Sequence, residues 1–517
     1  MTTKNLAKVY SAELEGIDAR VIEVEIDLNI GLHFFTIVGL ADKALNEARE
    51  RVNSALKNSG MKPPNRENRR ITINLAPADV RKTGAQYDLA IAIGYLLATR
   101  QIEKFDTSKI AFVGELALDG KLRTIRGALN IAEAAARRGF TFLFLPRANA
   151  DEGSAIKDVA MVPLDTLHDA LSALKDPTQK IYNADKNETE CLPPGADILE
   201  DGFDDIIGHE NAKRALVIAA AGGHNVLLSG PPGVGKSMLA QSARGILPAL
   251  SHHEAIEATK IWSAAGLSPG RLMRERPFRA PHHTASATAI MGGGQDPRPG
   301  EISLAHHGVL FLDELPEFPR NVLEALREPM ERGLAYIARS KRGAIFPADF
   351  MLVAAMNPCP CGFYGDLQKP CKCAAYEVVK YQKKISGPLL DRIDLQVSVE
   401  RVEIEMLRAP HKKDEGGGVG NIRTAITRAR EMQHKRFGSS GTPSNARMGT
   451  REVRSFVALE PSAEGFLATF DRKHLSPRGY YRVLKVARTI ADLEGSDRVA
   501  MEHIAEAYAY RIRDQDK

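Results

Sequence analysis

The chain has 517 residues, of which 44% are hydrophobic and 26% are charged, with 70 Lys and Arg against 65 Asp and Glu. At roughly 100 to 200 residues per domain, this length predicts several domains, and the composition excludes general disorder. The net charge of +5 is too evenly balanced to indicate nucleic acid by itself. The longest nearly uncharged apolar stretch, Leu89–Ala98, is too short to span a membrane, and the N-terminal residues lack the apolar segment of a secretory signal. We therefore expect a cytoplasmic protein without a membrane partner.

Residues 1–174 alternate strand-like and helix-like runs, which predicts a mixed α and β N-terminal domain. Lys43–Lys57 has the apolar spacing of an amphipathic helix. Strands are predicted at Val21–Ile26, Phe34–Val38, Arg70–Leu75, Ile110–Glu115 and Phe140–Leu145. Residues 175–202 then turn polar and include Pro193, Pro194 and Gly195, as is typical of a linker between domains.

Residues 203–402 carry the clearest chemical motif. A short apolar strand, 225–229, leads into a glycine-rich loop and then a helix-like run. Glycines let backbone N–H groups surround a phosphate, the lysine reaches the β- and γ-phosphates, and the serine hydroxyl binds Mg²⁺. The loop consists of Gly230, Pro231, Pro232, Gly233, Val234, Gly235, Lys236 and Ser237. The pattern therefore predicts a P-loop that binds ATP and Mg²⁺.

Further polar residues follow other apolar runs of the same domain. Asp313 and Glu314 come directly after the run 309–312, which predicts a metal ligand and a base that polarises the attacking water. Asn357 follows the run 350–356 and is expected to position the water or the γ-phosphate. Arg392 follows a short apolar turn and is the candidate finger that stabilises transition-state charge. The alternative for Arg392 is a surface or intradomain ion pair.

Residues 403–517 read as a helical C-terminal domain, in which glycine-rich loops separate the helices. Helices are predicted at Asn421–Arg436, Ser462–Phe470, Gly479–Leu493 and Ala500–Arg511.

The phrases GPPGVGKS, VLFLDE, AAMNP and SGPLLDRID together resemble an AAA+ ATPase, in the branch that includes magnesium chelatase subunits and the MCM helicases. FRAPHHTASATAIMGGG and LSPRGYYRVLKVARTIADLEG are more closely similar to the ComM (YifB) family. The resemblance implies an α/β multidomain protein with an AAA+ P-loop core on a parallel sheet and a helical lid. It implies a homo-hexamer with ATP at the subunit junctions, in which Asn357 is sensor 1, Arg392 a finger given in trans and Arg478 sensor 2.

The same resemblance implies an ATP-driven DNA motor, a helicase that carries out branch migration in homologous recombination during natural transformation. Its partners would be single-stranded and branched DNA, together with recombinase or single-strand-binding proteins. The alternative is an ATPase subunit that drives metal insertion or protein remodelling, as the magnesium chelatase kinship allows.

The N-terminal domain resembles the Lon protease domain in RITINLAPADVRKTGAQYDLAIAIGYLLA and FVGELALDGKLRTIRGALN. The catalytic serine and lysine of that family align here with Gln86 and Leu129, and neither can act as nucleophile or base. The resemblance therefore implies a non-proteolytic α+β module that serves assembly or guides DNA.

Two basic clusters are candidate DNA contacts. Arg271 and Arg274 belong to an arginine-rich insertion that also contains Arg276 and Arg279. Arg339, Lys341 and Arg342 form the tip of a hairpin predicted between residues 334–338 and 344–346. Such residues bind phosphates without reading sequence if they line a pore. The alternatives are a solvated face or ion pairs between subunits.

Four of the five cysteines are clustered directly after Asn357. Cys359, Cys361, Cys371 and Cys373 offer four thiolates on one short loop, which suits a structural Zn²⁺. Free buried thiols or a redox pair are the alternatives.

Overall fold

The computed structural model describes residues 6–32, 34–39, 45, 47–66, 68–80, 82–182, 202–294, 297–337, 343–366, 368–403, 405, 418–438, 442, 444–469 and 476–511. The chain divides into two compact units. Unit 1 comprises Met1–Pro194 and His252–Met273, and unit 2 comprises Gly195–Ser251 and Arg274–Lys517.

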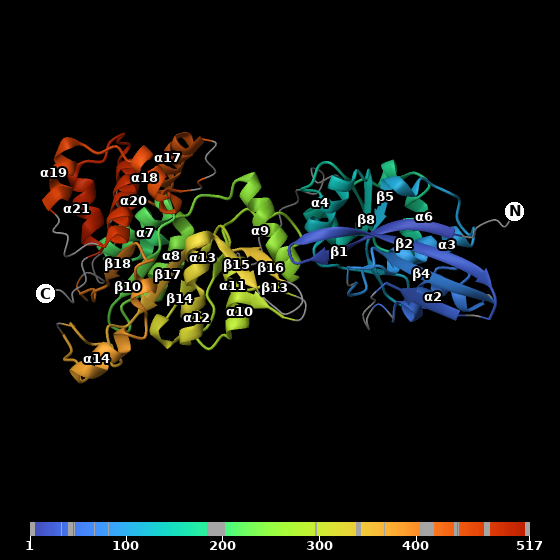
Figure 1. The fold of residues 1–517 in the computed structure, drawn as a ribbon, viewed down its shortest axis with the longest axis horizontal. Coiled ribbons are helices and arrows are strands. Elements are labelled where there is room, and N and C mark those ends of the chain that lie inside the picture. Colours follow the sequence, from blue (N-terminus) through green and yellow to red (C-terminus); the bar gives the residue numbers. More distant parts are fainter. Residues whose placement is uncertain are drawn as a thin grey trace. The chain divides into compact units, whose positions relative to one another are not determined.

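Unit 1 is built on a seven-stranded mixed sheet with the order β3-β4-β2-β1-β5-β8-β9. The strands are β1 Leu6–Glu15, β2 Asp18–Ile30, β3 Phe34–Val38, β4 Arg69–Ala76, β5 Ile110–Phe112, β8 Phe142–Pro146 and β9 Ala160–Leu164, with a small β6 Glu115–Leu116 and β7 Leu122–Arg123 hairpin. The long β1–β2 hairpin crosses the middle of the sheet (Figure 1). The five predicted strands are present, and the structure adds β1 and β9.

The helices of unit 1 bury the faces of this sheet. The apolar stretch noted in the sequence is α3, Asp88–Ala98, and nearly all of its residues are buried. It packs on β1 and β2, where Gly94 lets the helix approach closely: a Cβ there would lie 2.7 Å from Ile26 Cδ1. The other helices are α2 Ala48–Asn58, α4 Ala128–Arg138, α5 Ala150–Gly153 and α6 Leu167–Ala173. None of the helices in the described part of the chain is long and apolar enough to cross a membrane.

Unit 1 also contains helix α9, His252–Ala265, which lies within the stretch that the sequence assigned to the ATPase core. The helix packs on α4. Lys260 pairs with Glu133 at 2.7 Å, Asn130 donates to the Lys260 carbonyl at 3.2 Å, and the Gly127 N–H donates to the Ser263 carbonyl at 3.1 Å. These contacts attach the segment to the N-terminal fold, and the predicted core of 203–402 stays a prediction.

Unit 2 is built on a five-stranded parallel sheet with the order β11-β14-β17-β10-β18. The strands are β11 Phe278–Arg279, β14 Val309–Leu312, β17 Met351–Met356, β10 Val226–Ser229 and β18 Leu395–Ser398. Every residue of β14 and β17 is buried, as expected for strands that are covered on both faces. The sheet therefore has the parallel architecture that the resemblance implied.

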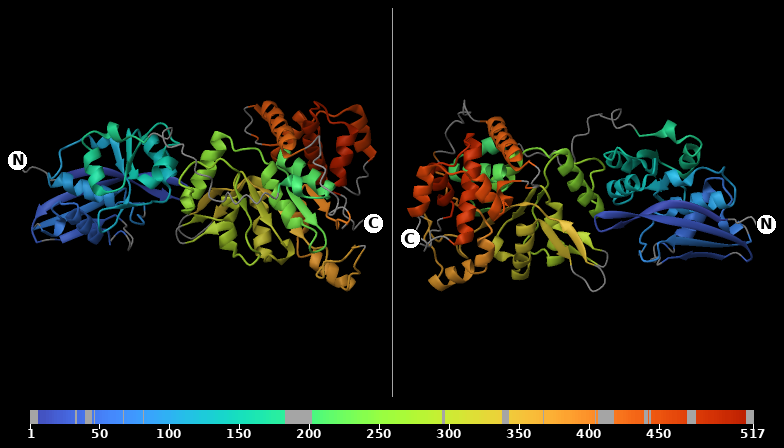
Figure 2. Two further views of the ribbon diagram at one scale, coloured as in Figure 1. Left: turned by 180° about the vertical axis from the view of Figure 1, so that it is seen from behind. Right: turned by 45° about the horizontal axis from the view of Figure 1, so that its top comes forward.

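The helices of unit 2 form two groups, and the C-terminal group, which packs on helices of the first, gathers as a bundle in all three views (Figures 1 and 2). The first group is α7 Glu210–Gly222, α8 Lys236–Ile246, α10 Ala287–Met291, α11 Glu301–Leu304, α12 Arg320–Ala325, α13 Arg327–Arg332, α14 Ala375–Gln382 and α15 Gly387–Leu390. The second group is α17 Val419–Phe437, α18 Thr450–Phe456, α19 Pro461–Thr469, α20 Pro477–Glu494 and α21 Met501–Ala509. The four helices predicted at this end are present, and α18 is added. A boundary at residue 402 stays a prediction, because both groups belong to unit 2.

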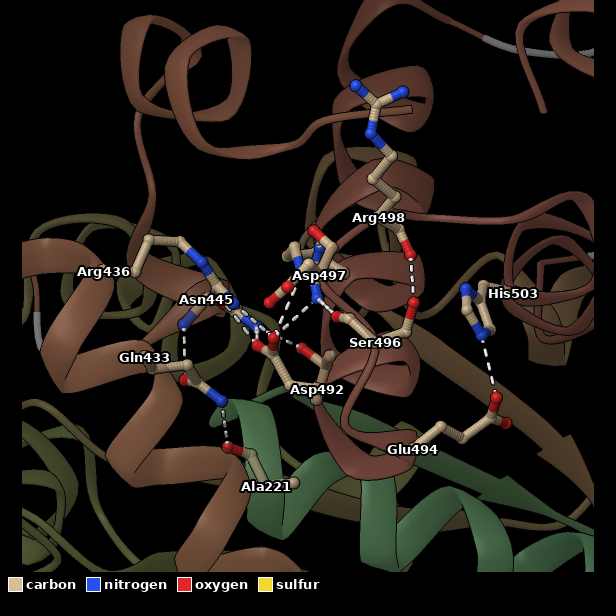
Figure 3. Close-up of polar contacts among 12 residues, drawn as sticks. Ala221, Gln433, Arg436, Asn445, Asp492, Glu494, Ser496, Asp497, Arg498 and His503 are labelled. Atoms are coloured by element: carbon tan, nitrogen blue, oxygen red, sulfur yellow. Dashed lines mark hydrogen bonds and ion pairs between the residues drawn. The ribbon is translucent and has the colours of Figure 1, made fainter. Parts of the chain in front are cut away.

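A buried polar network joins the C-terminal helices around Asp492 on α20 (Figure 3). The Asp492 carboxylate is fully buried and accepts hydrogen bonds from Arg436, Arg488 and Asn445. Gln433 extends the network to the carbonyl of Ala221 on α7, at 3.0 Å. Because the charged groups are buried together, each depends on the others for the solvation it has lost.

Replacing Asp492 with Asn is expected to destabilise unit 2 by about 3 to 5 kcal/mol, because two guanidinium groups lose their buried counter-charge. Calorimetry of the full chain measures this as a lower melting temperature for the unfolding of unit 2. The single tryptophan, Trp262, lies on α9 of unit 1, so its fluorescence transition is expected to stay in place. The exposed Asp497→Asn is the matched control and is expected to change stability by less than about 0.5 kcal/mol. Equal effects of the two variants would contradict the network's role.

Candidate nucleotide site

The predicted site residues come together because they follow neighbouring strands of one parallel sheet. Strand β17 lies between β10 and β14, so the carboxyl ends of the three strands meet at one edge. The P-loop follows β10, Asn357 follows β17, and Asp313 follows β14. The sequence named these residues separately, and the strand order places them side by side.

The P-loop requires glycine at three positions for different reasons. Gly233 and Gly235 have φ of +79° and +87°, in the left-handed region that side chains disfavour. At Gly230 a Cβ would lie 2.2 Å from the carbonyl oxygen of Val399. Helix α8 begins at Lys236, so the N–H groups of its first turn point out of the helix beside the loop. This arrangement is an anion site of the kind that cradles phosphates.

The Lys236 ammonium lies within this loop. It donates to the carbonyls of Gly230 at 2.7 Å and Pro231 at 2.8 Å, and to Asn357 Oδ1 at 3.1 Å. Burial lowers the pKa of Lys236, while the nearby carboxylates of Asp313 and Glu314 act in the opposite direction. Asn357 and the P-loop lysine are thus in direct contact.

Ser237 and Asp313 supply oxygen ligands suited to Mg²⁺. The Ser237 hydroxyl donates to Asp313 Oδ2 at 2.6 Å, and the other carboxylate oxygen accepts the Glu314 N–H at 2.9 Å. Hydroxyl and carboxylate oxygens are the hard donors that Mg²⁺ prefers, and the ion usually binds to one or two such groups together with phosphate oxygens. These two residues therefore fit the metal predicted for them.

Glu314, the predicted base, sits at a sharp change of chain direction. Its φ of +52° is left-handed, and its side chain is 54% exposed. The carboxylate lies 3.4 Å from His283 Nδ1. The sequence suggested no specific partner for this histidine, because it lies 31 residues before Glu314 and only the fold brings the two together.

Arg392 and Arg478, the predicted finger and sensor 2, do not contact the P-loop side chains in the described contacts. Both instead bind Glu331 on α13: Arg392 Nη2 donates to one carboxylate oxygen, and Arg478 Nη2 lies 3.4 Å from the other. Burial opposes ionisation of Glu331, but the Arg392 guanidinium lowers the pKa of this carboxyl below its ordinary value. No sequence pattern singles out Glu331, since an acidic residue on a short helix is typical of a solvated surface.

A second ion pair joins helix α20 to the turn that carries Arg392. Arg482, one helical turn after Arg478, donates to Asp394 and to the carbonyl of Arg392, the latter at 3.0 Å. Asp394 is also contacted by the buried His224, at 3.4 Å. Burial alone would raise the pKa of Asp394, but Arg482 and His224 hold it well below its usual value.

The four clustered cysteines lie close together, as the sequence predicted they would if they bound a metal. Their Sγ atoms all lie within 4.8 Å of one another. Cys359 is 3.4 Å from Cys361 and 3.7 Å from Cys371, and Cys361 is 3.6 Å from Cys371. These distances are far longer than the roughly 2.05 Å of a disulfide.

The DNA candidates are only partly placed. Strands β15 Leu334–Ile337 and β16 Ala344–Pro347 form the expected antiparallel hairpin. Its tip, Arg339, Lys341 and Arg342, lies outside the described residues.

In the arginine-rich insertion, Arg274 is exposed and Arg271 is half-buried. Arg276 donates to the carbonyls of Pro248 and His307, and Arg279 pairs with Glu301 at 2.6 Å. The last two arginines therefore support the local fold of unit 2.

The two positions that align with the Lon dyad are structural in unit 1. Leu129 is fully buried, and Gln86 donates to the Glu13 carboxylate at 3.1 Å. The Lon-like fold of this domain stays a prediction.

Comparison with known proteins agrees with this site. Residues 202–407 match the family described as magnesium chelatase, subunit ChlI, residues 24–149 match subunit ChlI of Mg-chelatase, and residues 419–511 match its C-terminal domain. Fold and site together thus define an AAA+ ATPase of the magnesium chelatase class. Competence protein ComM of Haemophilus influenzae is 41% identical, over 98% of this chain and 97% of its own length. The uncharacterized protein YifB of Escherichia coli is also 41% identical, over 99% and 98%. The chain belongs to the ComM (YifB) family, which confirms the resemblance.

A more distant relative covers only part of the chain. The magnesium-chelatase 67 kDa subunit of Chlorobaculum parvum is 30% identical over 30% of this chain and 23% of its own length.

Two variants separate nucleotide binding from turnover. Lys236→Ala is expected to weaken ATP binding, because the charge that faces the phosphates is lost. Glu314→Gln is expected to bind ATP but to reduce turnover at least about a hundredfold, the scale of a lost general base. Fluorescent ATP-analogue binding and phosphate release measure the two effects.

Glu317→Gln, three residues along and paired with Lys384 at 3.1 Å, is the control for Glu314→Gln and is expected to keep its turnover. Normal hydrolysis by Glu314→Gln would show that this residue is not the base.

Proposed function

We propose that the chain is the subunit of a hexameric ATP-dependent DNA motor, a helicase that migrates DNA branches in homologous recombination during natural transformation. The observation that carries the proposal is the contrast between the P-loop residues with their neighbours, which lie together, and the predicted arginine finger, which lies elsewhere. At the sheet edge Lys236 contacts Asn357, and Ser237 contacts Asp313. Arg392 is instead bound to Glu331. The likeness to a competence protein along nearly the whole chain supports the biological setting.

The position of Arg392 supports action on a neighbouring subunit. Its own-chain partners are Glu331 and the carbonyl of Pro388, and Arg478 shares the same carboxylate. An arginine that acts in trans must lie away from its own P-loop and be presented by a fixed element. The Asp394–Arg482 pair provides that fixed element here, since it joins the Arg392 turn to the lid.

ATP and Mg²⁺ are the proposed cofactors of the site. Bound Mg²⁺ would neutralise developing phosphate charge, and Ser237 and Asp313 would hold it. Lys236 and the P-loop N–H groups would bind the phosphates, Asn357 would orient the γ-phosphate or water, and Glu314 would take the proton. We also propose a structural Zn²⁺ on the four clustered thiols of Cys359, Cys361, Cys371 and Cys373.

Single-stranded and branched DNA are the proposed partners, together with recombinase or single-strand-binding proteins. Arg339, Lys341 and Arg342 at the hairpin tip, with Arg271 and Arg274, are the proposed phosphate contacts. The N-terminal module would serve assembly or guide DNA, and the motor would work in the cytoplasm.

The second candidate is an ATPase subunit that drives metal insertion or protein remodelling. The match of three segments to magnesium chelatase subunit ChlI favours it. ATP turnover that responds to a protein or porphyrin partner and ignores DNA would support this candidate against the motor.

A mixing experiment tests the trans finger and the ring together. Lys236→Ala and Arg392→Ala are each expected to lose ATP turnover. In mixed rings, a junction between an intact P-loop and an intact Arg392 re-forms at roughly a quarter of the interfaces, if subunits combine at random. Phosphate release should therefore reappear on mixing, and native mass measurement should give a hexamer. Two inactive variants that stay inactive in a demonstrated mixed ring would contradict action in trans.

DNA dependence tests the motor. ATP turnover is expected to rise with single-stranded or branched DNA, and Holliday-junction unwinding is expected with ATP. Arg339→Ala/Lys341→Ala/Arg342→Ala is expected to lose the stimulation and to reduce the slope of log affinity for single strands against log salt by about 2, for three lost phosphate contacts.

The charge-matched control is Arg428→Ala/Lys435→Ala/Arg451→Ala, which removes three exposed cations of the C-terminal helices. This control is expected to keep stimulation and salt slope. An equal loss in both triple variants would mean that only overall charge matters.

A further inference from the structure

The segment between Asn357 and α14 is an irregular loop that lies against the nucleotide site. Its described residues, 358–366 and 368–374, contain no helix or strand, and few of them are buried. An irregular loop of this length does not hold one shape through apolar packing, so it needs another constraint if it is to position anything. We name residues 358–374 the cysteine loop.

The four thiols of the cysteine loop have the spacing of a metal tetrahedron. Four sulfurs about 2.3 Å from Zn²⁺ stand about 3.8 Å apart. The three measured Sγ–Sγ distances are 3.4, 3.6 and 3.7 Å. The Cys373 N–H donates to Cys371 Sγ at 3.4 Å. Backbone donors of this kind orient the ligands of metal sites from outside.

The cysteine loop meets the P-loop at two points, one at the residue just before it and one within it. Asn357, two residues before Cys359, accepts a hydrogen bond from the Lys236 ammonium at 3.1 Å. Gly362, directly after Cys361, lies so close to the P-loop that a Cβ there would be 2.5 Å from Pro232 Cδ. The positions of both contacts are therefore set by where Cys359 and Cys361 are held.

We infer that Zn²⁺ bound by Cys359, Cys361, Cys371 and Cys373 fixes the cysteine loop against the P-loop, and that ATP affinity depends on this brace. The inference deepens the proposed function, because it rests on the ATP site proposed there. The ion takes no part in hydrolysis. It holds Asn357 and Gly362 at the distances that Lys236 and Pro232 require.

Metal content is the first test. Purified full-length protein is expected to contain about one zinc per chain by mass spectrometry of the metals. Cys371→Ser/Cys373→Ser removes the two ligands most distant in sequence from Asn357. This variant is expected to contain no zinc. It is also expected to bind a fluorescent ATP analogue at least about tenfold more weakly, which is the effect of losing one hydrogen bond to a charged group. The fifth cysteine offers the control, since Cys191→Ser lies outside the cluster and should keep both zinc and affinity.

The brace is tested separately from the metal. Gly362→Ala is expected to keep zinc but to weaken nucleotide binding, because its Cβ displaces Pro232. Gly365→Ala is the matched control: its φ of +80° resembles the +84° of Gly362, but nothing lies within 4 Å of its Cβ. It is expected to bind the nucleotide normally.

Three outcomes decide the matter. Protein without zinc, purified without chelators, overturns the inference, and so does equal nucleotide affinity of the two alanine variants with zinc retained. A third outcome separates the inference from the proposed motor. If the protein binds zinc and Gly362→Ala weakens nucleotide binding while Gly365→Ala does not, the inference is upheld. If the ATP turnover of the same protein does not change with DNA, the proposed motor is contradicted.

Discussion

The position of strand β17 between β10 and β14 is the constraint on which the nucleotide site depends. It brings Asn357 to the Lys236 ammonium and leaves Asp313 beside Ser237. The three strands are short and almost entirely buried, so packing in the apolar core brings their carboxyl ends to one edge of the sheet. The polar groups that follow the strands are therefore brought near one another by the packing of the strands.

Helix α20 and the turn that carries Arg392 are held in place by a different interaction, between charged groups that are buried together. Asp394 with Arg482, and Asp492 with Arg436 and Arg488, are pairs whose members lose solvation and are stable only in combination. Asp492, Arg478 and the Arg482 partner of Asp394 all lie on helix α20. This helix therefore joins the buried network of the C-terminal helices to the turn that carries Arg392.

Much of this could be predicted from the sequence. The P-loop, Asp313, Glu314 and Asn357 follow apolar runs, and the strand rule places them at one edge without knowledge of the fold. The predicted strands and C-terminal helices are present because their apolar periodicity is regular. Strands β1 and β9 and helix α18 were not predicted, because the apolar patterns of these segments are weak. The two strands are stabilised by pairing with β2 and β8, and the helix by its neighbours in the bundle.

Two features depended on the tertiary structure alone. Helix α9 reads as part of the ATPase core, yet its carbonyls and Lys260 bind α4 of unit 1. Glu331 is 61 residues from Arg392 and 147 from Arg478 along the chain, and a local sequence pattern does not predict contacts between residues so far apart. The chemistry of the nucleotide site can be read from the amino-acid sequence, because phosphate binding uses adjacent residues and strand ends. The carboxylate that holds the arginines, and the place where the cysteine loop meets the P-loop, follow from the folded chain, because those contacts join segments that are far apart along the sequence.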